Sequence, residues 1–371
     1  MIEERLSFRT LNREVIEPGI CAACYGCVSF CTANDLNVLT IESDKPVYCD
    51  EKNCLEDGIC YLICPRTPDL DNALKMRFHY KEPIGSYVAI RSLRTTNKEV
   101  AEVCCDGGVV TGLLEFLLDT KRIDGAVLSK REGMWNNEPM IAMDFKDLLK
   151  CAGSSLAQSK SVRDLGDLTT YAPIFSALKR SNLMDLTKLA VVGTPCQIST
   201  IRKMQILHIV PSHLVHFTIG LFCFENFLMH KDGRKYLSNK IGADLDEIEK
   251  INLKENFIVK LKNGMVKHID LDDLGPIVRS ACLACTDFCN YAADVSVGGL
   301  GSPDGYTTTV IRNRAAQRLI NLAISQGYLE EVEQKAALEK IERMAERKRK
   351  RGEQILARYH TKQVIKRVAL Q

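Results

Sequence analysis

The middle of the chain alternates between short apolar runs and amphipathic segments. Segments 107–120 and 194–204 carry apolar residues every three to four positions, which is typical of a helix buried on one face. Runs such as KLAVVG at 188–193 are short and almost continuously apolar, as in the buried strands of a sheet. The alternation predicts an α/β domain with a mixed sheet and helices. The expected strands are 86–92, 124–130, 188–193 and 215–223, the expected helices are 107–120, 171–182 and 194–204, and a β-hairpin is expected at Asn263-Gly264.

The two ends of the chain depart from this pattern. Residues 1–80 are dense in cysteine and poor in long helical patterns, which predicts a small α+β domain. A region of this size buries little apolar surface, so bound metal clusters would have to stabilise it. The highly charged segment 330–359 carries an apolar line that predicts a C-terminal helix. We therefore expect three parts, at 1–80, 81–325 and 326–371.

The predicted C-terminal helix contains the basic run RKRKR at 347–351. One interpretation is a solvated terminal helix that lies on the main domain. The other is a helix that docks on an acidic partner or surface. The sequence leaves both interpretations open.

Composition sets limits on location and partners. The chain has 371 residues and a formal net charge of +3, so charge gives no reason to expect nucleic acid as a partner. The most apolar stretch, 206–227, is interrupted by Pro211 and contains three histidines, so we expect buried core and no direct membrane span. The start MIEERLSFRT lacks the apolar core of a signal peptide. The expectation is a cytoplasmic protein that meets a membrane only through a partner complex.

Cysteine is the unusual component, with sixteen in the chain and eight of them before residue 65. Without a secretory context, such clustering favours metal or redox chemistry over disulfides. CAACYGCVSFC has the full C-x2-C-x2-C-x3-C spacing of ferredoxins, and CLEDGICYLICP repeats it with Asp57 at the second position. Because the fourth cysteine of each run ligates the other cluster, a two-cluster ferredoxin-like domain is predicted. The first cluster would use Cys21, Cys24, Cys27 and Cys64, and the second Cys31, Cys54 and Cys60.

The fourth ligand of the second cluster stays open. Asp57 could bind iron through its carboxylate, Cys49 could supply a thiolate, or the cluster could hold three irons and no fourth ligand. Asp57 could also be a loop carboxylate that faces water. Zinc is the structural alternative for the whole region, but zinc sites usually pair C-x2-C knuckles across a longer loop.

Three stretches of the α/β region carry candidate chemistry. Asp106-Gly107-Gly108 opens a predicted helix, where backbone N–H groups suit a phosphate, although a tight strand-to-helix turn also needs glycine. Cys196 lies in the first turn of the helix after Gly193, a position that favours the thiolate of a metal ligand or a nucleophile. A third four-cysteine site could combine Cys282 and Cys285 with Cys196 and Cys223.

Five motifs in this order resemble one known family. DGGVVTGLLEFLLD, VVGTPCQ, IGLFCFENF, the C-x2-C-x-D-F pattern and AADVSVGGLGSPDGYTTTVIR are similar to the beta-subunit family of coenzyme F420 hydrogenases and dehydrogenases, across about residues 85–315. With the two-cluster segment in front, the chain most resembles the F420H2 dehydrogenase input subunit of methanogenic and related archaea. The resemblance implies bound FAD, a [4Fe–4S] cluster in an α/β flavin domain, and coenzyme F420 as substrate.

The resemblance also implies a function and its residues. Hydride would pass between F420 and FAD, and single electrons through about three [4Fe–4S] clusters to a redox partner subunit or complex. No acid–base side chain is required for hydride transfer, so no catalytic residue is named. The residues implied at the FAD are Asp106, Gly107, Gly108, Val109 and Thr111, with Gly193, Thr194 and Pro195 beside the cluster.

Two departures from the family pattern matter. The family's Gly-Ser-Lys-Tyr stretch reads Gly153-Ser154-Ser155-Leu156 here, and Gly153 and Ser154 are expected to contact the cofactors. Cys289 is an additional cysteine, so the implied ligand set of Cys196, Cys282 and Cys285 leaves its fourth member open between Cys223 and Cys289.

Two alternative functions stay open at this stage. One is a beta subunit of an F420-linked formate dehydrogenase, hydrogenase or heterodisulfide reductase system. The other is an electron-transfer module that has lost F420 binding, which the altered stretch at 153–156 would favour. Neither the partner complex nor the direction of electron flow follows from the sequence.

Overall fold

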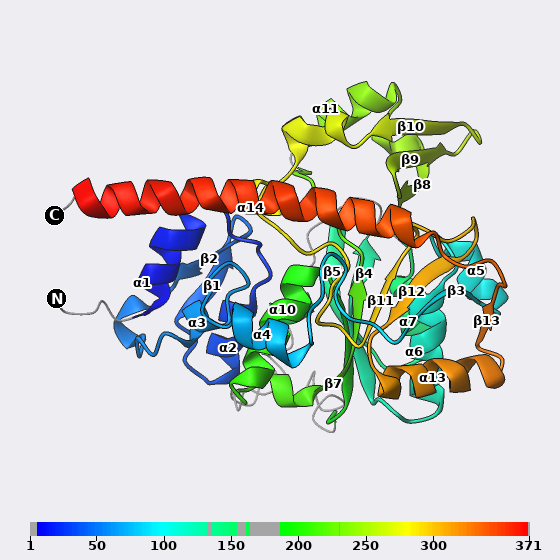
Figure 1. Ribbon diagram of the computed structural model, residues 1–371, viewed down its shortest axis with the longest axis horizontal. Coiled ribbons are helices and arrows are strands. Elements are labelled where there is room, and N and C mark those ends of the chain that lie inside the picture. The colour runs from blue at the N-terminus through cyan, green and yellow to red at the C-terminus, as the bar shows by residue number, and fades with distance from the viewer. Residues whose placement is uncertain (1–5, 133–135, 154–160, 164–185, 230, 370–371) are drawn as a thin grey trace.

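An eight-stranded mixed sheet lies at the centre of the molecule in the computed structural model (Figure 1). Its strands are β3 (Ala89–Thr95), β4 (Gly125–Glu132), β5 (Asn136–Ala142), β6 (Leu189–Gly193), β7 (Val215–Leu221), β11 (Val295–Gly298), β12 (Thr307–Ile311) and β13 (Leu329–Glu331). They are ordered β13-β3-β12-β11-β7-β6-β4-β5. The inner strands β11, β7, β6 and β4 are parallel, and the outer neighbours pair antiparallel. The predicted mixed sheet is confirmed.

The structure describes residues 6–132, 136–153, 161–163, 186–229 and 231–369. The helix expected at 171–182 and the cofactor contact expected at Ser154 lie outside the described residues. The remaining expected helices at 107–120 and 194–204 are present as α6 (Val109–Asp119) and α10 (Pro195–Ile206).

Helices cover both faces of the sheet, as strand alternation requires. On β4, Ala126 and Leu128 pack with α6, α7 (Phe145–Cys151) and α13 (Arg314–Ser325), whereas the intervening Val127 packs on the opposite face with α10 and α4 (Asp71–Arg77). Successive side chains of a strand point to opposite faces, so a strand buried on both sides is apolar throughout. Each fully buried Leu or Phe side chain stabilises the fold by about 1.5–3 kcal/mol.

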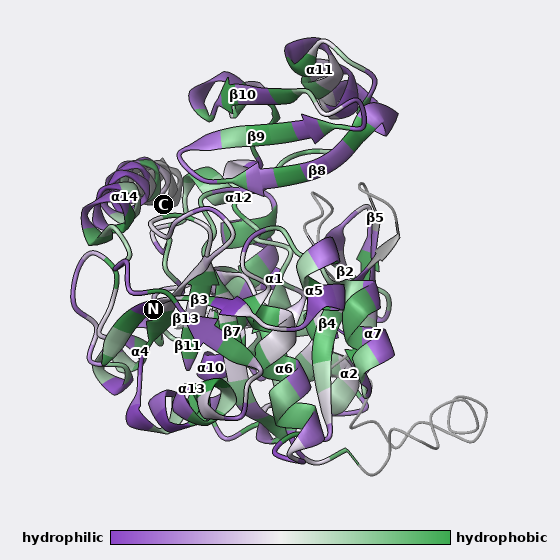
Figure 2. Ribbon diagram, turned by 90° about the vertical axis from the view of Figure 1, so that its right-hand side faces the viewer, coloured by the Kyte–Doolittle hydropathy of each residue, from purple (hydrophilic) through white to green (hydrophobic). Residues whose placement is uncertain are grey.

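A small antiparallel sheet stands apart from the main one, at the top of Figures 1 and 2. It contains β8 (Ile248–Leu253), β9 (Asn256–Leu261) and β10 (Val266–Asp270) and packs against α11 (Lys231–Ile241). The expected hairpin joins β9 to β10, and Gly264 in its turn has φ +84°, a conformation that favours glycine. The hairpin prediction is confirmed.

The cysteine-rich first 80 residues contain short elements. They are α1 (Phe8–Leu11), the π-helical turn η1 (Asn12–Ile16), α2 (Gly26–Ala33), β1 (Leu39–Glu42), β2 (Lys45–Tyr48), the 3-10 turn η2 (Glu51–Asn53), α3 (Ile59–Leu62) and α4. This region docks on α10: a side chain at Gly26 would collide with Thr200, and the Thr200 hydroxyl donates a hydrogen bond to the Ile63 carbonyl at 2.8 Å. The part boundaries at 80 and 325 stay predictions.

The C-terminal region corrects one prediction. The tail expected to be helical from 326 first forms β13, because Leu329 is buried and pairs with Thr95 at the open edge of β3. The helix itself, α14 (Leu338–Ala369), begins later and runs along the molecule, as Figure 1 shows in red. No helix in the described part of the chain has the length and apolar character needed to cross a membrane.

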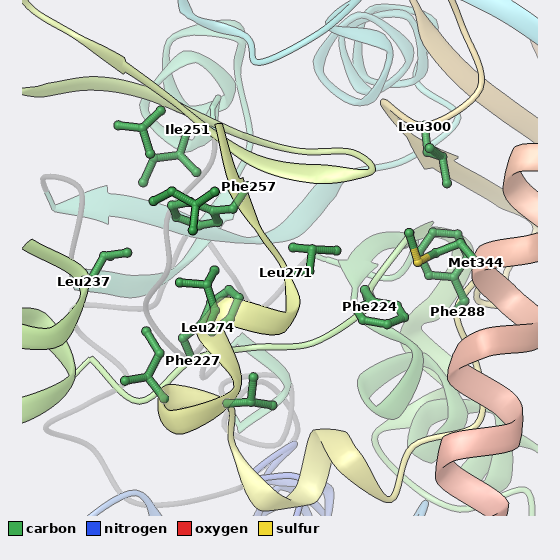
Figure 3. Packing of buried hydrophobic residues seen from close by; sticks show 14 of the residues in the cluster. Phe224, Phe227, Leu237, Ile251, Phe257, Leu271, Leu274, Phe288, Leu300 and Met344 are labelled. Carbon is green, nitrogen blue, oxygen red and sulfur yellow. The ribbon is translucent and has the colours of Figure 1, made fainter. Parts of the chain in front are cut away.

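Helix α14 contacts two regions that are far apart in sequence. Ile341, Met344 and Ala345 pack into a core with Phe288 and Leu300, as the close view in Figure 3 shows for Met344. Farther along, Ile355, Leu356 and Tyr359 pack against the N-terminal apolar cluster. The helix therefore joins the main domain to the cysteine-rich region.

The basic run 347–351 is largely engaged within the chain. Arg347 pairs with Asp272, Arg349 with Glu346 and Glu353, Lys350 with Glu346, and Arg351 with Glu225. Lys348 is buried. These contacts favour the interpretation of a terminal helix that lies on the main domain over that of a helix that docks on a partner. The helix is not fully solvated as expected, because Lys348 faces the interior.

Candidate cofactor and metal sites

A pocket of about 410 Å³ opens where three parallel strands end. Gly193 ends β6 and Thr194 follows it, Phe222 and Cys223 follow β7, and Gly299 follows β11. Because parallel strands place their carboxyl ends at the same edge of a sheet, this edge is the usual ligand site of α/β folds. The predicted cofactor residues in its lining are Asp106, Gly108, Val109, Thr111, Gly153, Gly193 and Thr194.

Two predicted residues have another place. The Gly107 N–H donates to the Thr307 hydroxyl at 2.9 Å, and a side chain there would lie 2.5 Å from the Leu93 carbonyl. Gly107 is therefore needed for the close passage between strands and is not in the pocket lining. Pro195 is the buried first residue of α10 and lies outside the lining as well.

The start of α6 forms one wall of the pocket. Gly108 precedes the helix with φ +67°, and the first N–H groups of such a helix carry partial positive charge. Asp106 lies beside them. Burial raises the pKa of its carboxyl group, and Lys254, with an Nζ 3.7 Å from the carboxylate, opposes the rise.

The small sheet supplies pocket residues that the sequence analysis missed. Asn252 donates a hydrogen bond to the Cys105 carbonyl at 3.1 Å, while its side-chain oxygen is buried and accepts no hydrogen bond from any described residue. Lys254 binds Asp304 at 2.7 Å as well as Asp106. An unpaired buried acceptor, a helix N-terminus and glycine-lined walls fit a large anionic cofactor such as the FAD that the resemblance implies. No motif pointed to β8, so only the fold reveals this contribution.

A third cysteine group lies beside the pocket. Cys223 follows β7 and lines the pocket, Cys196 lies in α10, Cys282 in α12 (Ser280–Leu283), and Cys285 just after it. Burial raises the pKa of the Cys223 thiol, and the thiols of Cys282, Cys196 and Cys285 raise it further. The structure thus brings the four implied ligands into one neighbourhood.

Polar groups hold these thiols in position. The Asn226 N–H donates to the Cys282 sulfur at 3.3 Å, and the Thr194 hydroxyl lies 3.2 Å from the Cys196 sulfur. Gln197 accepts from the Thr194 N–H at 3.0 Å and fixes the start of α10. Burial opposes ionisation of Cys285, but Lys348 and Arg66 lower the pKa of its thiol to about 7.

Cys289 has different neighbours. It packs in the apolar core. Burial raises the pKa of its thiol, Arg312 opposes the rise and Asp287 adds to it. Cys223, in contrast, responds to the three other thiols of the third group. These neighbours favour Cys223 over Cys289, and the ligand assignment stays a prediction.

The first predicted group surrounds a small cavity of about 20 Å³. Cys21, Cys24, Cys27 and Cys64 line it together with Cys60 and an apolar wall that includes Leu11, Val15 and Pro46. Burial raises the pKa of the Cys24 thiol, and the nearby thiols of Cys196 and Cys64 raise it further. Because Cys196 belongs to the third group, the first and third groups lie next to each other.

The second predicted group gathers Cys31, Cys54 and Cys60. The Val38 N–H donates to the Cys31 sulfur at 3.2 Å, and the Tyr48 hydroxyl donates to the Cys54 sulfur at 3.6 Å. Burial raises the pKa of Cys60, and Asp57 and Cys54 add to the rise. Within the described ranges, no three Cys, His, Asp or Glu side chains are arranged to hold a metal ion directly.

The two candidate fourth ligands of the second group lie at the surface. The Asp57 carboxylate accepts from the Ile59 N–H at 3.0 Å, which stabilises the turn before α3. The Cys49 thiol donates to the Asn37 carbonyl at 3.1 Å. The loop-carboxylate interpretation accounts for the hydrogen bond of Asp57, and both ligand assignments stay predictions.

The sequence analysis missed several cations near the cysteines, of which Lys203 and Lys348 are buried and Arg66 is partly buried. Lys203 donates to the Cys64 carbonyl at 2.8 Å and pairs with Asp71 at 2.8 Å. Arg66 donates to the Ala281 carbonyl at 2.9 Å, and Lys348 to the Cys223 carbonyl. Arg66 directly follows Cys64-Pro65 and could have been noticed there, whereas Lys348 is one of five basic residues in a run.

Comparisons with known proteins agree with the resemblance seen in the sequence. Residues 91–163 match the family model for the N-terminal part of the coenzyme F420 hydrogenase/dehydrogenase beta subunit, and residues 186–337 match the model for its C-terminal part. The chain is 32% identical over 365 residues to the coenzyme F420-dependent sulfite reductase of Methanocaldococcus jannaschii, covering 92% of this chain and 53% of that protein. It thus spans about half the length of that relative.

Two further comparisons cover more of the other protein. A subunit of the F(420)H(2) dehydrogenase of Methanosarcina mazei is 25% identical, over 91% of each chain. Among solved structures, a chain of the F420-reducing [NiFe] hydrogenase complex from Methanosarcina barkeri matches with a TM-score of 0.63 and 28% identity, over 74% of this chain and 92% of that chain.

Proposed function

Because the chain belongs to the coenzyme F420 hydrogenase/dehydrogenase beta-subunit family, we propose that it is the F420-linked subunit of an oxidoreductase complex. In this proposal it binds FAD, exchanges a hydride with F420, and passes electrons through iron–sulfur clusters to a partner complex. One observation carries it: Cys223 lines the large pocket and also belongs to the third cysteine group. A two-electron site and a one-electron site would thereby share a wall.

The pocket residues are suited to a dinucleotide. The N-terminus of α6 at Gly108 and Val109 would face a phosphate, and Asn252 offers an unpaired acceptor to a hydrogen-bond donor. When bound, FAD takes up a hydride and releases electrons one at a time. The pocket, at about 410 Å³, lies within the usual 300–1,000 Å³ of a ligand site.

The three cysteine groups are suited to iron–sulfur clusters in different ways. The first group surrounds a small cavity, and the third has the buried Lys348 and the partly buried Arg66 beside thiols that would be anionic. The second group, in which Cys31 and Cys60 are buried, has the exposed Asp57 and Cys49 as neighbours. We propose Cys223 as the fourth ligand of the third cluster, and a route for electrons from the third group through the first to the second.

The partner is a separate proposal. The match to the F(420)H(2) dehydrogenase of Methanosarcina mazei extends over 91% of both chains, which supports a subunit of that type. The greater identity to about half of a sulfite reductase supports a second candidate, a chain that supplies electrons to a sulfite-reducing partner. Co-purification separates the two, because only the second candidate predicts a partner that reduces sulfite.

The test is an anaerobic purification followed by iron and FAD analysis and addition of F420H2. Bleaching of flavin and cluster absorbance, with roughly twelve irons per chain for three [4Fe–4S] clusters, is expected. An iron count nearer eleven would indicate a three-iron cluster at Asp57. Full iron and flavin without bleaching would contradict the F420 part of the proposal.

A further inference from the structure

The third cysteine group receives a buried cation from the C-terminal helix. Lys348 on α14 is 1% exposed, and its ammonium group donates to the Cys223 carbonyl. Among the described residues no carboxylate oxygen lies within 4 Å of this ammonium group. Burial lowers the pKa of Lys348, but the Cys285, Cys223 and Cys282 thiolates outweigh it and raise the value.

A second cation reaches the same group from the cysteine-rich region. The Arg66 guanidinium donates to the Ala281 carbonyl at 2.9 Å and to the Ala284 carbonyl at 3.4 Å, and these residues precede Cys282 and Cys285. The Arg66 Nε is buried and has no hydrogen-bond partner among the described residues. Like Lys348, Arg66 has no carboxylate within 4 Å in the described part of the chain.

Arg66 also acts on the first cysteine group. Lys348 is not among the groups that act most on the pKa values of Cys64 and Cys21. Burial raises the pKa values of Cys64 and Cys21, and Arg66 is among the groups that oppose both rises. The third cation, Lys203, is already neutralised by Asp71. Arg66 therefore lies between the first and third groups, and Lys348 belongs to the third alone.

The fold brings α14 close enough to deliver its charge. Gly352, one turn beyond Lys348, is buried, and a side chain there would lie 2.6 Å from the Cys285 carbonyl oxygen. Glycine inside a helix is less favourable than alanine. The cost is offset here by the close contact between the helix and the segment that carries Cys282 and Cys285.

A buried cation without a counter-charge is strongly unfavourable, so this arrangement requires an anion. The carboxylates of Asp287 and Glu225 act on Lys348 at longer range, but each is also held by an arginine, and four thiolates that hold a cluster provide the remaining charge. Reduction adds one further negative charge, which nearby cations stabilise, and the potential of a cluster depends on net charge and on hydrogen bonds. The cations should therefore favour the reduced form.

Building on the cluster assignment of the proposed function, we propose that Lys348 and Arg66 are counter-cations of the cluster at Cys196, Cys223, Cys282 and Cys285, and raise its reduction potential. Arg66 also raises the potential of the first cluster. Both are positioning residues, because they act on the cluster through charge and backbone contacts. The C-terminal helix is thus part of the electron-transfer site.

The test is a dithionite titration of the full-length, cluster-loaded chain, monitored by electron paramagnetic resonance. Cys282→Ala identifies the signal of the third cluster. In Lys348→Met that signal alone should shift, with at least a tenfold lower ratio of reduced to oxidised cluster at a fixed potential, equal to 59 mV for one electron. In Arg66→Met two signals should shift in the same direction.

Matched variants separate charge from packing. Lys348→Arg should keep the potential close to that of the unmodified chain. Lys350→Met removes an exposed charge from the same helix and Arg77→Met an exposed charge at the end of α4, and both should leave all signals in place. If Lys348→Met loses about four irons while Lys348→Arg keeps them, the counter-cation role is supported.

Two results would overturn the inference. One is Lys348→Met with full iron and an unchanged midpoint, and the other is an equal loss of iron in Lys348→Met and Lys348→Arg. A chain that forms no cluster at Cys282 would overturn it as well. Because dithionite replaces F420H2, failure of the F420 reaction leaves this test intact and counts only against the proposed function.

Discussion

The second and third cysteine groups use the same residue type in opposite settings. Cys31, Cys54 and Cys60 come from a segment of thirty residues, and the neutral donors Val38 N–H and Tyr48 hydroxyl contact two of their sulfurs. Asp57, whose carboxylate adds to the raised pKa of Cys60, is exposed. The third group draws its thiols from residues 196 to 285 and its cations from residues 66 and 348, so it depends on nearly the whole chain.

The second group therefore depends on residues close in sequence, whereas the third depends on distant parts of the chain. A group built by one short segment tolerates changes elsewhere in the fold. A group assembled from three regions is sensitive to any of them, including a helix that carries no ligand. Changes at the third group or at α14 should therefore leave the second group intact.

The largest expected effect is that of Cys282→Ala. It removes a thiol from the third group, so we expect loss of about four of twelve irons and a roughly 100-fold or greater fall in electron transfer to an artificial acceptor. Reduction of FAD by F420H2 should persist. Loss of flavin reduction together with electron exit would contradict the proposed order of the sites.

A change in α14 should act on the third group from a distance. Gly352→Ala places a methyl group against the Cys285 carbonyl, and such overpacking typically costs about 1–3 kcal/mol. We expect a lower melting temperature and partial loss of iron from the third group alone. The exposed Gln354→Ala on the same helix is the control, and iron lost equally from all groups would break the comparison.

The pocket provides a pH-dependent test of charge compensation. Burial raises the pKa of Asp106 and Lys254 opposes it, so Lys254→Met should raise that pKa further. A carboxyl group with a raised pKa binds more protons in the folded state than in the unfolded state. Its ionisation therefore destabilises the folded state increasingly as pH rises from the unfolded pKa through the folded one. We expect a loss of about 1–3 kcal/mol at pH 8 and a smaller loss at pH 5.

Chemical denaturation at the two pH values measures this effect. The double variant Lys254→Met/Asp106→Asn removes the titrating group, so its loss of stability should not depend on pH. A Lys254→Met loss that is equal at pH 5 and pH 8 would show that Asp106 does not control the effect.

The smallest effect is expected at the second group. Asp57→Ala removes the hydrogen bond to the Ile59 N–H, and loss of such a local cap costs about 0.5–2 kcal/mol. The irons of the first and third groups should remain. A total near eight irons would instead identify Asp57 as a ligand of the second cluster.

The sequence predicts what is encoded locally. The spacing of Cys21, Cys24 and Cys27 places them around one cavity, and the apolar period of 107–120 and 194–204 yields α6 and α10. These features depend on neighbours along the chain. The mixed sheet and the hairpin at Asn263-Gly264 follow from the same kind of signal.

Features that depend on distant contacts were not predictable in this way. The choice between Cys223 and Cys289 needs their spatial neighbours, and Asn252 reaches the pocket from a small sheet that has no motif. Leu329 lies in a charged segment, but the free edge of β3 recruits it into a strand. The side chain of Lys348 points inward from a run that is otherwise solvated or ion-paired.

The long helix α14 has a consequence for the order of assembly. Chains are made from the N-terminus, and domains generally fold in that order during synthesis. The cysteines before residue 65 can gather while the ribosome is still translating the sheet. The third site gains Lys348 only after α14 has left the exit tunnel. Insertion of iron there would then come later than at the cysteines before residue 65.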